Sequence, residues 1–281
     1  MKKVLITGKN SYIGTSFEQY AEEKYPGQFR IDTLDMRDSG WREKDFSGYD
    51  TVFHVAGIAH ADVEKVSEEE KKRYYDVNCH LAVETAKKAK EQGVGLFVFM
   101  SSIIVYGESG GIGEKRVIKA DTPLTPANFY GDSKVKAEEG LRPLADGDFQ
   151  IAILRPPMIY GEGCKGNYRT LEKFAKIMPV FPAIENERSV LSIENLAKTV
   201  EKIIQNPESG VYFPQDARYG HTAKMVQDIS AGKGKKVRLT KIFNPAIRCI
   251  GKTKGKYGRL VNKAFGNLCY DKELKVEKWN P

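Results

Sequence analysis

The sequence predicts an α/β protein: a doubly wound parallel sheet wrapped by helices, with a small C-terminal lobe for substrate. Strand-like and helix-like patterns alternate from the first residues, as in strand–helix–strand units. A glycine-marked turn joins the first strand to the first helix. The 281 residues, 41% of them hydrophobic, suffice for one large core and an appended lobe. We expect a dinucleotide-binding domain over residues 1–160 and the lobe with a basic tail over 161–281, interleaved as one unit.

The first hundred residues alternate short apolar runs with longer amphipathic segments. Runs of four to eight apolar residues predict strands, and apolar residues repeated every three or four positions predict helices. Val77, Leu81 and Ala89 form one such helical face. We expect strands at 4–7, 29–36, 51–56 and 96–101, a helix at 12–24, and one or two helices over 67–92.

The later elements are fewer and less regular. A helix is expected over 130–140, where Asn128 is a suitable cap. A strand over 150–155 ends at Pro156 and Pro157, because proline cannot donate to a sheet. Beyond it we expect helices at 171–177 and 193–205, a proline-rich loop at 179–182, and a basic tail.

The turn from Thr7 to Gly14 lies between a predicted strand and a predicted helix. In that context, amides at the helix start can bind a pyrophosphate, as in Rossmann-like folds. Gly8 would allow the tight turn, and Gly14 would let the helix pack closely on the strand. The middle position is Ser11, which is small and can donate a hydroxyl to phosphate. A plain strand-to-helix turn is the alternative.

Ser102, Tyr130 and Lys134 are the candidate catalytic residues. Tyrosine titrates near ~10 in water, so it needs help to exchange protons at neutral pH. Lys134, one helical turn after Tyr130, is expected to lower the tyrosine pKa by its charge. The spacing alone is weak evidence, because Tyr20 and Lys24 repeat it in a position where we expect a surface pair.

The composition excludes several classes of protein. The longest mostly apolar stretch, 94–106, falls short of the ~18 residues that a membrane span needs. Met1-Lys2-Lys3 leads directly into a strand, so we expect no secretory leader and a cytoplasmic protein. The four cysteines and four histidines show no ligand spacing, which predicts reduced thiols and no metal.

The net charge of +8 is uneven, with many Lys and Arg residues over 231–263. Such a segment suits an anionic partner: a nucleotide diphosphate, a lipid surface or nucleic acid. A merely solvated face is the alternative. We expect no nucleic-acid partner, and peripheral contact with an anionic membrane is a weaker hypothesis.

Six motifs in order resemble the extended short-chain dehydrogenase/reductases that act on nucleotide sugars, a group that includes epimerases and dehydratases. Each motif is weak alone, but together they cover about residues 1–215. They are the 8–14 loop, Asp50 to Gly57, Val77-Asn78, Ser101 to Gly107, Tyr130 to Lys134, and Leu154 to Gly161.

The resemblance implies a role for each matching residue. Tyr130 would be the acid/base, Ser102 would polarise the reacting oxygen, and Lys134 would also hold the nicotinamide ribose. The substrate would be a UDP-sugar whose diphosphate meets Asn167 and Arg188. The implied cofactor-binding residues are Gly8, Asn10, Ser11, Tyr12, Ile13, Gly14, Asp35, Met36, Arg37, Val55, Ala56, Gly57, Asn78, Tyr130, Lys134 and Pro157.

Two departures from the family pattern carry information. Dehydratases of this group place an acidic pair directly after the catalytic hydroxyl residue, where this chain has Ile103 and Ile104, so dehydration is not expected. Compared with the family, a stretch of sequence is missing near Asp35 and Arg37. By distance from Gly14 these residues end the second strand, but by their sequence they resemble the family's following strand, so their alignment to the family stays open. Asp35 would favour NAD and Arg37, with Lys9, would favour NADP; a solvated charge cluster is the third possibility.

Later segments are similar to a narrower group, bacterial 4-reductases of UDP-4-keto-6-deoxy-N-acetylhexosamines used for capsule and O-antigen. These segments are 166–168, 179–182, 186–189, 210–216 and 265–268. His60 also fits that group and would touch the sugar, or would be a structural hydrogen-bonder. The resemblance implies an NAD(P)-dependent C4 reductase and a homodimer. The alternatives are a UDP-sugar C4 epimerase that retains NAD, and a non-catalytic nicotinamide-sensing protein.

Overall fold

The computed structural model describes residues 1–59 and 66–279. Its main sheet has the order β13-β10-β6-β4-β3-β1-β2. The strands are β1 (Lys2–Thr7), β2 (Phe29–Leu34), β3 (Thr51–His54), β4 (Leu96–Met100), β6 (Gln150–Leu154), β10 (Gly210–Tyr212) and β13 (Glu277–Lys278). Every pairing is parallel except that of β13 with β10. The predicted doubly wound sheet is confirmed.

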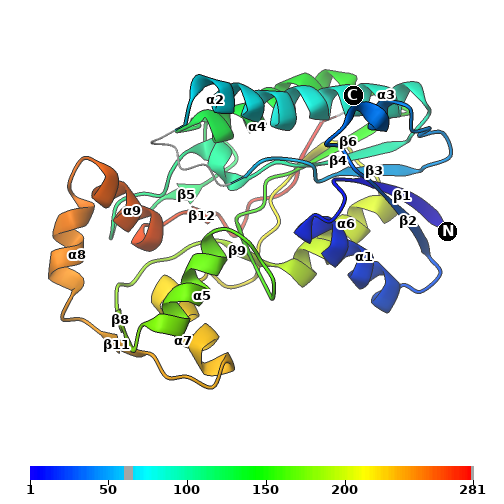
Figure 1. The fold of residues 1–281 in the computed structure, drawn as a ribbon. Helices are drawn as coiled ribbons and strands as arrows, with labels where there is room; N and C mark the ends of the chain where they lie inside the picture. Colours follow the sequence, from blue (N-terminus) through cyan, green and yellow to red (C-terminus); the bar gives the residue numbers. More distant parts are fainter. Residues whose placement is uncertain (60–65, 280–281) are drawn as a thin grey trace.

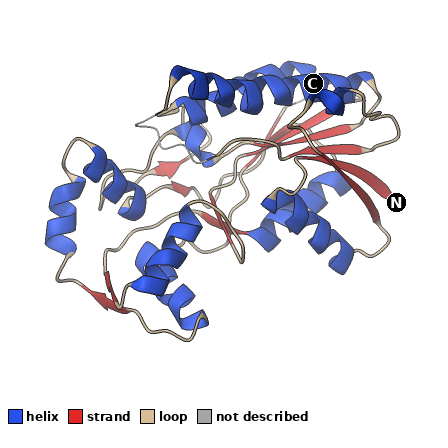
Figure 2. Ribbon diagram, in the orientation of Figure 1, coloured by secondary structure: helices blue, strands red, loops and turns tan. Residues whose placement is uncertain are grey.

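Helices cover both faces of this sheet (Figures 1 and 2). On one side lie α2 (Glu68–Tyr75), α3 (Leu81–Glu91) and α4 (Phe129–Leu141), and on the other lie α1 (Tyr12–Lys24) and α6 (Ile193–Gln205). A π-helical turn, Asp76–His80, joins α2 to α3. Because α6 packs on α1 and β10 pairs with β6, the chain returns to the sheet after entering the second lobe.

The second lobe has its own apolar core, which includes Leu171, Phe181, Val226 and Phe265. It is built from α5 (Asn167–Ile177), β8 (Val180–Pro182), α7 (Thr222–Gly232), β11 (Arg238–Thr240), α8 (Asn244–Gly251) and α9 (Lys256–Phe265). Two small parallel ladders, β7 (Met158–Tyr160) with β9 (Val190–Ser192) and β5 (Val117–Ile118) with β12 (Cys269–Tyr270), complete the fold.

Three expectations about elements were wrong. Residues 179–182 are not a loop, because Val180–Pro182 forms β8 and pairs in parallel with β11. The segment 231–263 is not a tail: it contains β11, α8 and α9. Tyr20 is not simply a surface residue, since it packs partly buried against the core beside α1.

The missing stretch is an outer strand. The usual doubly wound order places two strands beyond the first one. Here β2 is the last strand on that side within the described residues, and the 3₁₀ turn Ser39–Arg42 follows it. Asp35 therefore comes directly after the strand that pairs with β1, which settles its register.

Candidate active site

The turn between β1 and α1 brings backbone amides to the carboxyl end of the sheet. Gly8 has φ = 120°, and a Cβ there would lie 2.9 Å from the backbone nitrogen of Ala56. Asn10 is also left-handed, with φ = 61°. Ser11 caps α1, accepting a hydrogen bond from the Gly14 amide at 3.1 Å. Ser11, Tyr12 and Ile13 at this helix start line a cavity, a placement that fits the pyrophosphate of a dinucleotide.

Ser102, Tyr130 and Lys134 line one cavity of about 540 Å³, which is a typical size for a ligand site. Ser102 follows β4 by one residue and begins the 3₁₀ turn of residues 103–106. Tyr130 and Lys134 lie one turn apart at the start of α4, where the Asn128 side chain caps the helix. The structure thus brings the three predicted catalytic residues together.

The ammonium of Lys134 is held from behind the cavity. Its Nζ donates to the Met100 carbonyl at 2.8 Å and lies 4.7 Å from the centre of the Phe99 ring. Burial lowers the pKa of Lys134 to about 8, although the nearby Glu138 carboxylate opposes this shift. A lysine so placed keeps a fixed position beside Tyr130.

The expectation that Lys134 lowers the pKa of Tyr130 was wrong. Burial raises the pKa of Tyr130 to about 12, and its hydrogen-bond partner Ser102 only opposes that rise. Both groups lose water together, so the cost of forming a phenolate exceeds the benefit of the neighbouring charge. At neutral pH Tyr130 therefore carries its proton and can donate it.

A buried ion pair lies behind the catalytic residues. Glu138 of α4 and Arg155, directly after β6, have side chains only 2% and 3% exposed. Ser101, the neighbour of Ser102, donates to the same carboxylate at 2.5 Å, and Arg155 donates to the Tyr106 hydroxyl at 2.6 Å. These contacts tie α4 to the ends of β4 and β6, so they fix the distance between Tyr130 and Ser102.

Asn78 lies fully buried in the π-helical turn and not on the cavity wall. Its side chain accepts from the Ile58 amide at 2.8 Å and donates to Ser133 at 3.1 Å. A Cβ on Gly57 would lie 3.1 Å from the Asn78 Oδ1 and 3.4 Å from the Lys134 Nζ. Asn78 therefore holds the segment after β3 against α4.

The predicted adenosine end is exposed. The Arg37 guanidinium pairs with the Asp35 carboxylate and lowers the pKa of Asp35 to about 2. The Arg37 side chain is 81% exposed. Met36 between them is buried in the main core. Neither charged residue lines the catalytic cavity, and their choice between NAD and NADP stays a prediction.

Arg188 points its charge into the cavity among neutral partners. Its guanidinium donates to the Lys263 carbonyl and to the Ser109 hydroxyl, each at 2.7 Å. Burial lowers the pKa of Arg188 to about 10. No acidic side chain of the described residues pairs with it, so an anionic diphosphate would supply the missing counter-charge. Asn167, the first residue of α5, lines the same cavity.

The structure places eleven predicted residues on this cavity wall: Ser11, Tyr12, Ile13, Val55, Gly57, Ser102, Tyr130, Lys134, Pro157, Asn167 and Arg188. His60 lies outside the described residues. Sequence reasoning missed the wall supplied by α9, namely Lys256, Arg259, Leu260, Asn262 and Lys263. Their spacing of three and four is the signal that could have identified one helical face.

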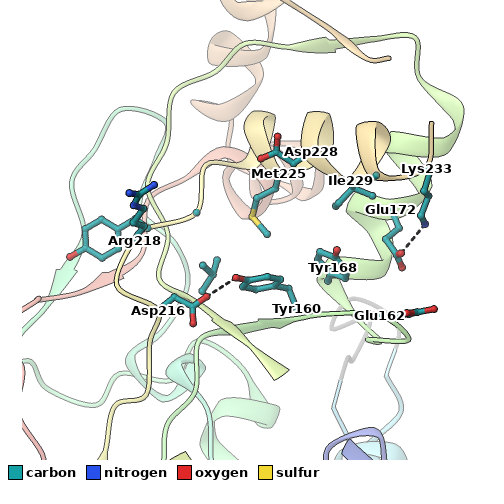
Figure 3. Close-up of a pocket in the computed structure, with 14 residues that line it drawn as sticks. Tyr160, Glu162, Tyr168, Glu172, Asp216, Arg218, Met225, Asp228, Ile229 and Lys233 are labelled. Atoms are coloured by element: carbon teal, nitrogen blue, oxygen red, sulfur yellow. Dashed lines mark hydrogen bonds and ion pairs between the residues drawn. The ribbon is translucent and has the colours of Figure 1, made fainter. Parts of the chain in front are cut away.

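A second cavity of about 790 Å³ lies in the second lobe, beside α5 and α7 (Figure 3). Two pairs of its polar lining residues interact with each other. Tyr160 donates to Asp216 at 2.7 Å, and Lys233 pairs with Glu172 at 2.9 Å. None of its described lining residues is a predicted catalytic residue, so we place the chemistry in the first cavity.

A glycine-marked phosphate turn and a Ser-Tyr-Lys set on a doubly wound sheet define a nicotinamide-dependent enzyme of the extended short-chain dehydrogenase/reductase type. The NAD dependent epimerase/dehydratase family matches residues 4–213, and the chain belongs to this family. Its cofactor is therefore NAD or NADP.

Two relatives match nearly the whole chain. UDP-glucose 4-epimerase from Vibrio cholerae is 29% identical over 100% of this chain and 91% of the relative. The N-acetyl-alpha-D-glucosaminyl-diphospho-ditrans,octacis-undecaprenol 4-epimerase of Escherichia coli O157:H7 is 28% identical over 98% and 85%. The fold is similar to that of a dTDP-4-dehydrorhamnose reductase from Clostridium acetobutylicum, with a TM-score of 0.67, 21% identity, and 85% and 82% coverage.

Proposed function

We propose that the protein reduces the C4 ketone of a UDP-4-keto-6-deoxy-N-acetylhexosamine in polysaccharide biosynthesis. The observation that carries this proposal is the convergence of Ser102, Tyr130, Lys134 and Arg188 on the wall of one cavity. The bound nicotinamide supplies a hydride to C4. Ser102 donates a hydrogen bond to the C4 oxygen, and Tyr130 gives that oxygen its proton. Arg188 binds the diphosphate.

The residues after Ser102 support reduction over dehydration. Elimination of water needs an acid and a base of its own near the sugar. Ile103 and Ile104 line the cavity at these positions and can serve as neither. Reduction needs no more than a hydride, a proton donor and a pocket that holds one face of the ketone.

The adenosine end supports a cofactor that exchanges. A reductase must release oxidised cofactor after each turnover, whereas an epimerase must retain it. Within the described residues the sheet ends at β2, and beyond it the Arg37 side chain is 81% exposed while that of Asp35 is 28% exposed. An end so little enclosed favours release.

A C4 epimerase that retains NAD is the second candidate, because both relatives that match nearly the full chain are 4-epimerases. In that reaction Tyr130 and Ser102 would act first on the C4 hydroxyl and then on the C4 ketone, so the same cavity residues serve both candidates. The intact Ser102, Tyr130 and Lys134 argue against a non-catalytic nicotinamide sensor. UDP as the carrier and a cytoplasmic location stay predictions.

The test is to mix the protein with a UDP-4-keto-6-deoxy-N-acetylhexosamine and NADH or NADPH. We expect one cofactor to be oxidised per 6-deoxy sugar nucleotide formed. Tyr130→Phe is the control that should abolish this signal. The reductase proposal is wrong if no cofactor is consumed but UDP-glucose or UDP-N-acetylglucosamine is converted to its C4 epimer without added nicotinamide. The protein is then a C4 epimerase. Cofactor binding with neither reaction would support the sensor.

A further inference from the structure

The positive charge of this chain resides in one segment. Residues 229–270 contain eleven Lys and Arg and no Asp or Glu. The rest of the chain has 34 Lys and Arg against 37 Asp and Glu, so it is slightly acidic. A charge so concentrated has a local cause and is not a property of the whole surface.

The most exposed part of this segment is the α8–α9 hairpin, which we define as residues 241–263. It lies at the outer edge of the second lobe (Figure 1). The two helices contact each other, and Asn262 donates to the Gly251 carbonyl at 2.9 Å. Beyond Lys263, Phe265 is buried in the core of the lobe, which attaches the hairpin firmly.

Apolar side chains point into solvent from this hairpin. Nine large hydrophobic residues of the described chain are exposed, and five of them are here. They are Ile242 (82%), Phe243 (49%), Ile250 (40%), Tyr257 (74%) and Leu260 (60%). Exposed apolar groups that gather in one place usually mark a binding surface.

Exposed basic residues lie between these apolar ones along the chain. Lys241 precedes Ile242, Arg248 lies two residues before Ile250, and Lys252 and Lys254 occupy the turn between the helices. Both helices are amphipathic. Apolar side chains ringed by Lys and Arg on a short helix are typical of segments that lie in the interface of an anionic membrane.

We propose that the α8–α9 hairpin docks onto an anionic lipid bilayer. The helices have eight and ten residues, and no helix within the described residues is long and apolar enough to cross a membrane. The hairpin would therefore rest on the surface. A second copy of the chain is a poorer occupant, because residues 241–263 contain no Asp or Glu, so Lys241, Arg248, Lys252, Lys254 and Lys263 of one copy would face the same five residues of the other.

Docking would bring the catalytic cavity to the membrane. Lys256, Leu260 and Lys263 belong to α9 of the hairpin and also line the catalytic cavity. Provided that the proposed C4 reaction is correct, a sugar diphosphate would enter beside the headgroups. The surface itself does not depend on that reaction.

The experiment is sedimentation of the full chain, without substrate or cofactor, with vesicles of phosphatidylglycerol and phosphatidylcholine. We expect binding at low salt that weakens at high salt, and none to phosphatidylcholine alone. No sedimentation with the anionic vesicles at low salt would overturn the proposal.

Two variants outside the cavity wall sharpen this test. Lys252→Gln with Lys254→Gln should weaken partitioning about thirtyfold, since each lysine contributes about fivefold. Ile242→Ser with Phe243→Ser should remove the part of vesicle binding that remains at high salt, because that part comes from apolar contacts. The matched control, Ile177→Ser with Lys198→Gln and Lys202→Gln, changes similar exposed residues elsewhere and should bind normally. Equal loss in the control would overturn the proposal.

Two further readouts separate the competing explanations. If the wild type is an oligomer that Ile242→Ser with Phe243→Ser dissociates, and it ignores vesicles, the face joins copies of this chain and the proposal fails. None of the substituted residues lines the cavity, so NADH-dependent turnover should persist in every variant. If the wild type binds vesicles but shows no NADH-dependent turnover, only the proposed reaction is contradicted.

Discussion

The Glu138 carboxylate pairs with the Arg155 guanidinium one helical turn beyond Lys134, in a position from which water is almost entirely excluded. The pair joins α4 to the end of β6, and Ser101 joins the same carboxylate to β4. The geometry between Tyr130 and Ser102 thus depends on two residues that do not line the catalytic cavity.

We predict that Arg155→Met lowers the free energy of unfolding by about 3 to 5 kcal/mol, because it leaves a buried carboxylate without its partner. Urea denaturation measures this. The double variant Glu138→Leu with Arg155→Met should lose much less than the sum of the single losses. As a control, Glu139→Gln breaks the exposed pair with Lys136 on the same helix and should cost under about 1 kcal/mol.

Tyr130→Phe should reduce turnover by about 10² to 10⁴, the usual contribution of a general acid or base. Cofactor affinity should stay within a few-fold, because only the proton path is removed. Tyr20→Phe is the matched control, since it removes a hydroxyl from the other Tyr-x-x-x-Lys pair. Turnover within tenfold of the wild type would contradict the catalytic role of Tyr130.

Lys134→Met should lose both turnover and cofactor binding, yet gain stability at neutral pH. Burial lowers the pKa of Lys134 to about 8 from an unfolded value of 10.5. The unfolded chain therefore binds the proton more tightly, and the cost is fully present below about pH 8. We expect a gain of about 3 kcal/mol at pH 7 that shrinks as the pH rises from 8 to 10.5. Thermal unfolding across this range checks it, and a difference independent of pH would contradict the cause.

Arg188→Ala should raise KM for the nucleotide sugar and spare cofactor binding. A charged hydrogen bond is worth roughly 1.5–3 kcal/mol, which corresponds to about 10- to 150-fold. Arg218→Ala is the control, since Arg218 lines the second cavity. Equal effects of both substitutions on KM would mean that Arg188 acts through the fold of the lobe.

The main sheet was predictable because its strands are apolar runs and its turns are marked by glycine. Asn128 was predictable as a helix cap because capping is a local contact: its side chain accepts a hydrogen bond from the Gly131 amide, three residues later. The candidate catalytic set was predicted from the order of the motifs. All three of its members line one cavity, and their catalytic role stays a prediction.

What could not be predicted depends on tertiary contacts. The strand Val180–Pro182 forms because β11, more than fifty residues later, pairs with it. The pKa of Tyr130 rises because distant elements exclude water from it, which no local spacing reveals. The sequence of the α8–α9 hairpin predicted a basic tail because it is rich in Lys and Arg. Helix α8 has no buried residue, and α9 is anchored by Gly258 and Phe265, whose burial depends on the rest of the lobe.

In the part of the chain that the structure describes, no strand lies beyond β2, so this edge of the sheet and the predicted catalytic residues belong to different elements. The predicted catalytic residues come from the loop after β4 and from α4, whereas the edge beyond β2 contributes none of them. We therefore expect that the segment at this edge can be replaced without displacing the predicted catalytic residues. Grafting residues 35–50 from a relative with a different nucleotide preference would alter which dinucleotide is accepted, while the reacting groups keep their positions.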